Sequence, residues 1–553
     1  MSSILFHGGT VWTGDEEGAT TALLVTDGLV SATGIGAVAR AAAIDEVSGE
    51  GSVQRIDLEG GFLAPSFGDG HAHPIFGGLE SEGPDVRACT SVDEIVAEVR
   101  RYADEHPELE AIIGGSYDGS LSPEGLFDAR WLDEAVSDRP VVLRASDYHT
   151  MWVNSKALEL AGIDASTPEP ELGAIPRRDD GSPFGVLREW GATDLLTGTV
   201  PDHPLETRIR ALERAGEYYL QRGVTWVQDA WVEPVDIDTY LEAVAQGRLP
   251  MRVNIAQYAD PRRFSEQLPA FVDARARVEA AASPLLTAST VKFFADGVIE
   301  NETGALLEPY CSSLHDHGMS VWGAEKLAEA VRAVDAAGFQ VHIHAIGDDA
   351  VRQALDAIES AIRENGPRDR RPVIAHAQLV DPSDLGRFAA LGVIPNMQPL
   401  WAQLDGLMTV LTLPRLGPER SLQQYRLRTL VESGAALAFG SDWPVSSGDP
   451  REGLAVAASR QTADGVPEGG WTPDEILPIE HALAAYTSGV AHQAFADLHS
   501  ASWGRIRPGA SADLVWLARD PRDVSPLDLP AVEIRQTYLA GEPRHTLRRN
   551  DAS

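Results

Sequence analysis

Short apolar segments alternate with amphipathic helical segments between residues 61 and 502. In TRIRALERAGEYYLQRG (207–223) and AEKLAEAVRAVDAAGFQ (324–340), apolar residues recur at helical spacing. Strands that alternate with helices are typical of βα units in a parallel sheet, and eight such strands fill a TIM barrel. We expect the eight strands at residues 63–73, 224–230, 251–258, 289–297, 339–348, 371–379, 392–399 and 435–444.

The two ends of the chain follow a different pattern. Residues 1–60 alternate short β-like runs with glycine-containing turns, and residues 503–553 have the same character. We therefore predict one composite sheet domain built from residues 1–60 and 503–553, attached to an α/β TIM barrel of residues 61–502.

One further apolar segment, RPVVLRASDYHTMWVNS (139–155), has no place among the eight strands. We assign it to an insertion of about residues 80–204, which follows the first barrel strand. Long insertions at the catalytic face of a barrel often act as a lid or as a wall of the substrate site.

Composition and charge narrow the class of protein. The chain has 553 residues and a formal net charge of −38, without a basic cluster, which argues against nucleic acid or an anionic membrane as partner. No apolar run is long enough to span a bilayer, and the first residues do not resemble a signal peptide. Only Cys89 and Cys311 occur, as expected in a reducing compartment. The sequence therefore predicts a soluble cytoplasmic protein with a small-molecule substrate.

The first expected strand ends in two histidines, His71 and His73, that are one residue apart. On a strand such residues point to the same side, about 7 Å apart along the chain, so one metal ion could join them. An isolated pair of this kind is more often plain polar surface. Partners on other strands decide between the two interpretations.

Four such partners lie at the ends of other expected strands, where the catalytic residues of a TIM barrel are found: Lys292, His344, His376 and Asp442. Imidazoles with a carboxylate are the ligands of Zn²⁺ or a similar divalent ion with a position open for water. A structural zinc site is the alternative, but such sites favour cysteine, and neither cysteine is near a histidine motif.

Several segments together resemble a known family, among them GGFLAPSFGDGHAHP, VHIHAIGDDAVRQAL, FGSDWPVSSGDP and GRIRPGASADLVWL. Over nearly its whole length the chain resembles the amidohydrolase superfamily, metal-dependent hydrolases with a TIM barrel and an attached β-sandwich. It is most similar to the branch of long amidohydrolases that includes N-substituted formamide deformylase.

The resemblance implies a role for each candidate residue. His71, His73, His344 and His376 would bind one or two divalent ions, most often zinc, and Asp442 would be both a ligand and a proton shuttle. Lys292 falls where many members carry a CO2-derived carboxylated lysine that bridges two metals. The alternative for Lys292 is an ordinary lysine paired with a carboxylate such as Asp296.

Two histidines lie on the fifth expected strand. His344 is nearer the carboxyl end of that strand than His342, so we expect His344 to be the ligand. His342 is then a hydrogen-bonded core residue or a support for a ligand.

The substrate-binding residues are less well defined. Arg144 and His149 in the insertion match a motif that the branch places near its active site, with surface hydrogen bonding as the alternative. Gln228 stands where relatives often have a histidine. Trp401 and Trp443 flank motif residues and could contact an apolar substrate, although buried aromatic residues usually serve packing.

These residues predict hydrolysis of an amide-like C–N bond, such as that of an N-substituted formamide, by a metal-activated water. Ester, carbamate, lactam or deamination chemistry on the same site is an alternative, because the fold does not determine the substrate. A metal-binding scaffold without catalysis is another. The resemblance also favours a homodimer.

Overall fold

The computed structural model describes residues 2–14, 18–201, 203–312, 316–498 and 502–547. Its central sheet has eight parallel strands, and each overlaps one of the expected segments, which confirms the predicted barrel. The strands are β8 (Phe67–Ala72), β13 (Val224–Val232), β14 (Arg252–Tyr258), β15 (Leu286–Phe294), β16 (Gln340–Ala345), β17 (Val373–His376), β18 (Ile394–Met397) and β19 (Ala438–Phe439).

The first and last strands meet where the barrel closes. The backbone nitrogen of Asp442 donates to the carbonyl oxygen of His71 at 2.7 Å, and that of Ser441 donates to Asp69 Oδ1 at 2.9 Å. The two strands approach so closely that a Cβ atom at Gly440 would lie 2.7 Å from the backbone nitrogen of His71. Glycine is therefore required here, and the closure brings His71 and Asp442 together.

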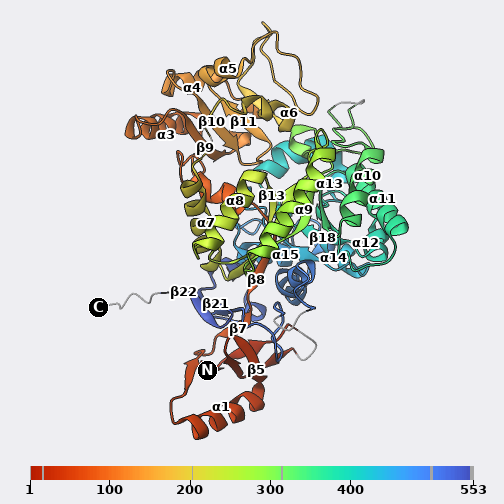
Figure 1. Cartoon of the computed structure of the whole chain (residues 1–553). Coiled ribbons are helices and arrows are strands. Elements are labelled where there is room, and N and C mark those ends of the chain that lie inside the picture. Colours follow the sequence, from red (N-terminus) through yellow and green to blue (C-terminus); the bar gives the residue numbers. More distant parts are fainter. Residues whose placement is uncertain (1, 15–17, 202, 313–315, 499–501, 548–553) are drawn as a thin grey trace.

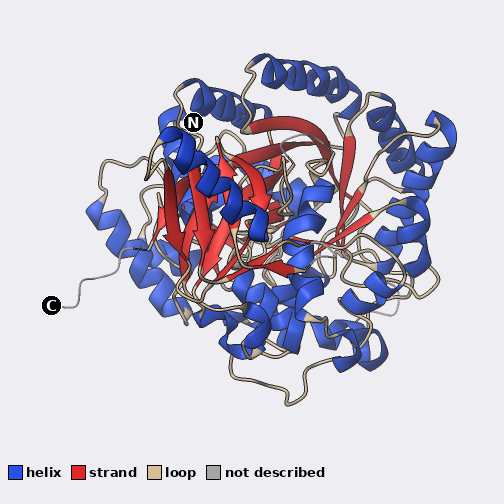
Figure 2. Ribbon diagram, turned by 90° about the horizontal axis from the view of Figure 1, so that it is seen from below, coloured by secondary structure: helices blue, strands red, loops and turns tan. Residues whose placement is uncertain are grey.

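Helices surround the barrel, as Figure 2 shows from below. Their inner faces carry small and branched apolar residues at helical spacing, such as Val351, Leu355 and Ile358 of α11 (Asp348–Asn365), which are buried. The other long helices are α7 (Leu205–Leu220), α8 (Pro234–Ala245), α9 (Phe264–Ala280), α10 (Ala324–Ala336) and α15 (Pro450–Ser459). None of the helices in the described part of the chain is long and apolar enough to cross a bilayer.

Strands from both chain ends share one sheet, which lies below the barrel in Figure 1. Its order is β22 (Glu542–Thr546), β21 (Ile534–Leu539), β20 (Leu514–Leu517), β7 (Phe62–Pro65), β2 (Thr10–Trp12) and β3 (Ala19–Thr20). A second sheet contains only N-terminal strands, in the order β5 (Leu29–Thr33), β4 (Leu23–Thr26), β1 (Ser3–His7) and β6 (Val53–Asp57).

One N-terminal element differs from the expected run of strands. Residues Gly34–Ser48 form helix α1, which buries Ala37 and Ala41 against Leu5 and Leu24 of the second sheet. The segment is rich in alanine, the best helix former, and this preference outweighs the β-like pattern on either side.

The insertion folds around its own core above the barrel (Figure 1). Its sheet has the order β12 (Val186–Arg188), β11 (Thr150–Val153), β10 (Val141–Ala145) and β9 (Ile112–Tyr117), and α3 (Val92–Glu105), α4 (Ala129–Ala135) and α5 (Ser155–Ala161) pack beside it. The single strand expected over 139–155 is in fact two antiparallel strands. The chain turns between them because Asp147 Oδ1 accepts hydrogen bonds from the backbone nitrogens of His149 and Thr150.

Candidate active site

The carboxyl ends of the barrel strands bring three predicted ligands into one cluster. His71 is in β8, His73 begins the helix α2 (Pro74–Glu80) that follows, and Asp442 follows β19. Asp442 Oδ1 lies 2.9 Å from His73 Nε2 and 3.4 Å from His71 Nε2, and all three residues are buried. Each offers one ligand atom within 4.8 Å of the others, which is close enough for a single ion.

The other three predicted ligands lie directly beside this cluster. The ring of His376 is 4.6 Å from that of His71 and 4.5 Å from that of His344, centre to centre. Lys292 Nζ lies 3.5 Å from His71 Nε2. All six residues therefore meet at one end of the barrel, although only three share the tight cluster.

The protonation of these residues suits a cation. Burial lowers the pKa of all four imidazoles, that of His376 to about 3, so each keeps a free lone pair at neutral pH. Burial alone would raise the pKa of Asp442, but its contacts with His71 and His73 hold it well below the usual value.

Lys292 makes no direct ion pair with a described carboxylate, although the charge of Asp442 lies near enough to act on it. Asp296, the alternative partner, instead accepts hydrogen bonds from the backbone nitrogens of residues 305, 346 and 347 at 2.8 to 3.0 Å. Burial lowers the pKa of Lys292 to about 7, which leaves a substantial share of its amine neutral at physiological pH. The lysine–aspartate pair is thus not formed.

A divalent ion fits this donor set. Asp442 Oδ1 is buried and has no hydrogen-bond donor among the described residues, although two imidazole nitrogens face it. A hollow of about 20 Å³ lies among His71, His73, His344, His376 and Asp442, which is room for one water or ion. A cation there would satisfy lone pairs that otherwise repel one another.

Backbone geometry also marks this end of the barrel. His376 and Asp442 have positive φ angles of 74° and 59°, a conformation that costs a residue with a Cβ about 1 kcal/mol or more. Such residues cluster at functional sites because the surrounding structure holds them in place.

Neighbouring side chains orient the cluster. His342 Nε2 lies 2.7 Å from His71 Nδ1, and Gln398 Oε1 lies 2.8 Å from His376 Nδ1. His342 therefore supports a ligand from one pleat below His344. Asp69 is a residue that the sequence reasoning missed: it accepts hydrogen bonds from the backbone nitrogens of His71 and Ser441. Its place two residues before His71 on the same strand was the available signal.

Comparisons with known proteins agree with this geometry. The model of the amidohydrolase family matches residues 54–545. The chain belongs to the amidohydrolase family. It is 31% identical to the protein LONG AFTER FAR-RED 3 of Arabidopsis thaliana, over 98% of this chain and 91% of that protein. It is 28% identical to N-substituted formamide deformylase of Arthrobacter pascens, over 95% of this chain and 94% of that enzyme.

A solved structure extends the likeness to the whole fold. An uncharacterized metal-dependent hydrolase from Pyrococcus horikoshii OT3 superposes with a TM-score of 0.74 at 26% identity, covering 95% of this chain and 99% of that one. This amidohydrolase is therefore a metal-dependent hydrolase, and its family and fold imply a divalent metal.

A buried charge pair lies next to the candidate metal ligands of the amidohydrolase. His149 Nδ1 lies 2.8 Å from Glu189 Oε2, and Thr303 Oγ1 donates to the other oxygen of Glu189 at 2.6 Å. Burial opposes the charge on His149, but Glu189 raises its pKa to about 9. His149 is therefore an imidazolium at neutral pH, and its ring lies 5.5 Å from that of His344.

A cavity of about 330 Å³ opens beside this group. The loops that follow β15 to β19 line it, and the insertion completes it with residues 118, 146, 147 and 149. Of the five predicted substrate-binding residues, His149 and Trp401 line this cavity, and Trp401 stacks on His376 with ring centres 5.3 Å apart.

The other three predicted substrate residues do not line it. The guanidinium of Arg144 lies over the rings of Phe76 and Tyr148, and Trp443 stacks on Tyr218 at 4.5 Å, so both serve packing. The amide of Gln228 is buried within the barrel and bonds to Asn254, because its position on β13 is below the strand end.

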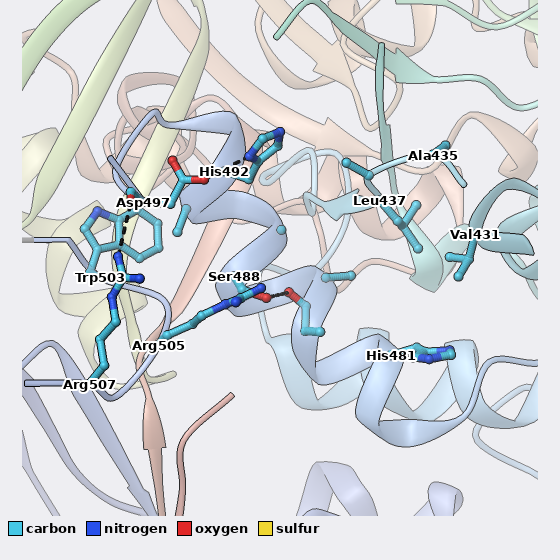
Figure 3. A pocket seen from close by; sticks show the side chains of 15 residues that line it. Val431, Ala435, Leu437, His481, Ser488, His492, Asp497, Trp503, Arg505 and Arg507 are labelled. Carbon is cyan, nitrogen blue, oxygen red and sulfur yellow. Dashed lines mark hydrogen bonds and ion pairs between the residues drawn. The ribbon is translucent and has the colours of Figure 1, made fainter. Parts of the chain in front are cut away.

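A larger cavity, of about 470 Å³, lies at the opposite end of the barrel. Figure 3 shows it between Trp503 and Arg505 on one side and Leu437 and Val431 on the other. Leu437 precedes β19, whereas the metal ligands lie at or just beyond the carboxyl ends of the strands, so this cavity does not reach the candidate active site.

Proposed function

We propose that this amidohydrolase cleaves an amide-like C–N bond, of which an N-substituted formamide is the leading example. The observation that carries the proposal is the contact of Asp442 Oδ1 with both His71 and His73, since Asp442 also lines a cavity large enough for a small-molecule substrate. The likeness to N-substituted formamide deformylase supports the choice of bond.

The residues that would hold the metal are His71, His73 and Asp442, with His344, His376 and Lys292 available for a second ion. Zinc suits this set because its usual ligands are imidazole and carboxylate. When bound, a divalent ion of this kind lowers the pKa of a coordinated water to about 7 and polarises the carbonyl group.

Asp442 acts as the proton carrier. Ionised and buried, it accepts the proton of the attacking water and later gives it to the departing amine nitrogen, so that the C–N bond breaks and a neutral amine leaves. Its carboxylate faces His71 and His73 from a backbone with positive φ.

His149 stabilises the charge that develops on the carbonyl oxygen. Its Nδ1 is engaged by Glu189, and its Nε2 makes no hydrogen bond to a described residue. Since His149 lines the cavity, Nε2 is free to donate to the substrate oxygen.

Lys292 is proposed to be carboxylated. Its Nζ is buried, makes no direct ion pair with a described carboxylate and lies beside His71. The neutral amine would attack CO2, form an N–C bond and release one proton to water, giving a carbamate that would supply oxygen ligands to a metal. Intact mass and a crystallographic map of the metal-loaded, active enzyme test this, and an unmodified Lys292 in that enzyme would refute it.

The test of the proposed function is a panel of N-substituted formamides, simple amides and esters with metal-replete protein. Turnover of the amides supports C–N hydrolysis. Turnover of esters alone moves the activity to the other carbonyl class, and no turnover at all favours a metal-binding scaffold.

A further inference from the structure

The cavity beside the metal cluster carries an excess of negative charge. Among the described residues that line it there is no lysine or arginine, and its cationic His149 is already paired with Glu189. Five carboxylates line it: Asp118, Asp147, Glu300, Asp405 and Asp442.

Three of these carboxylates have a structural partner. Asp147 binds the backbone of its own turn and the side chain of Asn301, at 3.2 Å. Asp118 and Asp405 each accept a hydrogen bond from a backbone nitrogen of their own loop, at 2.8 Å. Asp442 belongs to the metal cluster, so Glu300 remains to be explained.

Glu300 lies in the short helix η4 (Ile299–Asn301) that follows β15. Its Oε2 is buried and has no hydrogen-bond partner among the described residues. Arg415 is the arginine whose charge acts on Glu300, but it forms its ion pair with Glu302, at 3.3 Å. Burial raises the pKa of Glu300 to about 7, although the nearby charges of His149 and Arg415 oppose this shift. A buried acceptor without a donor is costly unless a ligand supplies one.

Apolar side chains form part of the remaining wall of the cavity. It includes Val298, Ile346, Trp401, Leu407 and Met408. A ligand in this cavity therefore meets hydrocarbon and aromatic side chains as well as carboxylates.

We propose that the substrate is an amide whose apolar arm ends in a protonated amine, and that Glu300 binds this amine. The inference rests on the proposed function and names its substrate class. Charge-assisted hydrogen bonds to a carboxylate are among the strongest available, and an apolar arm suits the apolar side chains of the wall. Substrates that end in a carboxylate, such as N-acylated amino acids, are excluded by repulsion from the same groups.

Three formamides of similar length test the proposal: N-formylcadaverine, with a terminal ammonium; N-formylhexylamine, with a terminal methyl; and 6-formamidohexanoate, with a terminal carboxylate. The expected kcat/KM of the metal-loaded enzyme is about tenfold to a hundredfold higher for the ammonium than for the methyl compound, and lowest for the carboxylate. Equal values, or a preference for the methyl or the carboxylate compound, would overturn the inference.

Two variants assign the preference to Glu300. Glu300→Gln should bring the kcat/KM for the ammonium compound, divided by that for the methyl compound, to about one. The amide keeps the shape of the side chain and loses its charge. Glu308→Gln makes the same change at an exposed position outside the cavity and should keep the wild-type ratio. An unchanged ratio in Glu300→Gln would contradict the assignment, and the wild-type ratio tests the substrate class even if that variant does not fold.

Failure of the proposed function gives a different result from failure of this inference. If none of the three compounds is hydrolysed, C–N hydrolysis of this class is wrong, and the same compounds are then titrated into the wild-type holoenzyme by calorimetry. A Kd for N-formylcadaverine at least about tenfold below that for N-formylhexylamine supports the amine site, and equal affinities refute it.

Discussion

His71 and His342, 271 residues apart in the sequence, share a hydrogen bond of 2.7 Å between Nδ1 and Nε2. Since His71 Nε2 faces Asp442, Nδ1 is the nitrogen left to carry the proton, and His342 accepts it. A histidine ligand whose second nitrogen is held in this way keeps its tautomer and its ring orientation. The deeper histidine of β16 thus acts on the metal cluster through its neighbour.

This relationship predicts a ranking between the two histidines of β16. His342→Asn should weaken metal binding by about 10–100-fold, as loss of an orienting partner usually does. His344→Asn should lose more metal, because it removes a ligand. Metal content after dialysis against graded chelator measures both, and a greater loss in His342→Asn would reverse the assignment.

Asp442→Asn should keep most of its metal and lose turnover by about 10²–10⁴-fold, since the amide still offers an oxygen but cannot take a proton. Steady-state kinetics and metal analysis of the same sample check this. Near-normal kcat in the variant would show that another group accepts the proton.

Glu189→Gln should change the pH dependence of kcat/KM. The ordinary pKa of histidine is 6.5. In the wild type the pKa of His149 is raised to about 9, so its imidazolium persists as the pH rises above 6.5. Without the Glu189 charge this pKa falls, so the alkaline loss of activity moves to lower pH and the variant is impaired most between pH 6.5 and 9. An alkaline limb that does not move would exclude His149 as the donor to the substrate oxygen.

Asp69 should contribute to stability where the barrel closes. Its carboxylate accepts hydrogen bonds from the backbone nitrogen and the hydroxyl of Ser441 and, at 3.1 Å, from Tyr219 Oη. Asp69→Ala leaves these buried donors without an acceptor and should lower the free energy of unfolding by about 2–4 kcal/mol. Tyr219→Phe removes one donor and should cost about 1 kcal/mol. Urea unfolding measures both, and equal small losses would mean that the closure does not depend on Asp69.

Much of the barrel could be predicted because its signals are local. Most of the strands lie in short apolar runs, and His71, His344, His376 and Asp442 stand at or near strand ends. The family resemblance added roles to residues that the pattern had already placed.

The remaining features depend on contacts that a local pattern does not contain. The His71–His342 and Asp69–Ser441 contacts join residues hundreds of positions apart. Arg144 and Trp443 are near motif residues in sequence, yet tertiary packing turns them onto aromatic rings. Glu300 lies in the short helix η4, where three residues are too few for a periodicity to mark a binding residue. The homodimer and the cytoplasmic location stay predictions.

The most direct test of the metal-dependent mechanism is elemental analysis of the purified protein together with its amide turnover, before and after chelation. We predict at least one divalent ion per chain, loss of turnover when the ion is removed and recovery when it is restored. Two ions per chain would favour the carboxylated Lys292. Full turnover by protein that holds no metal would contradict the account.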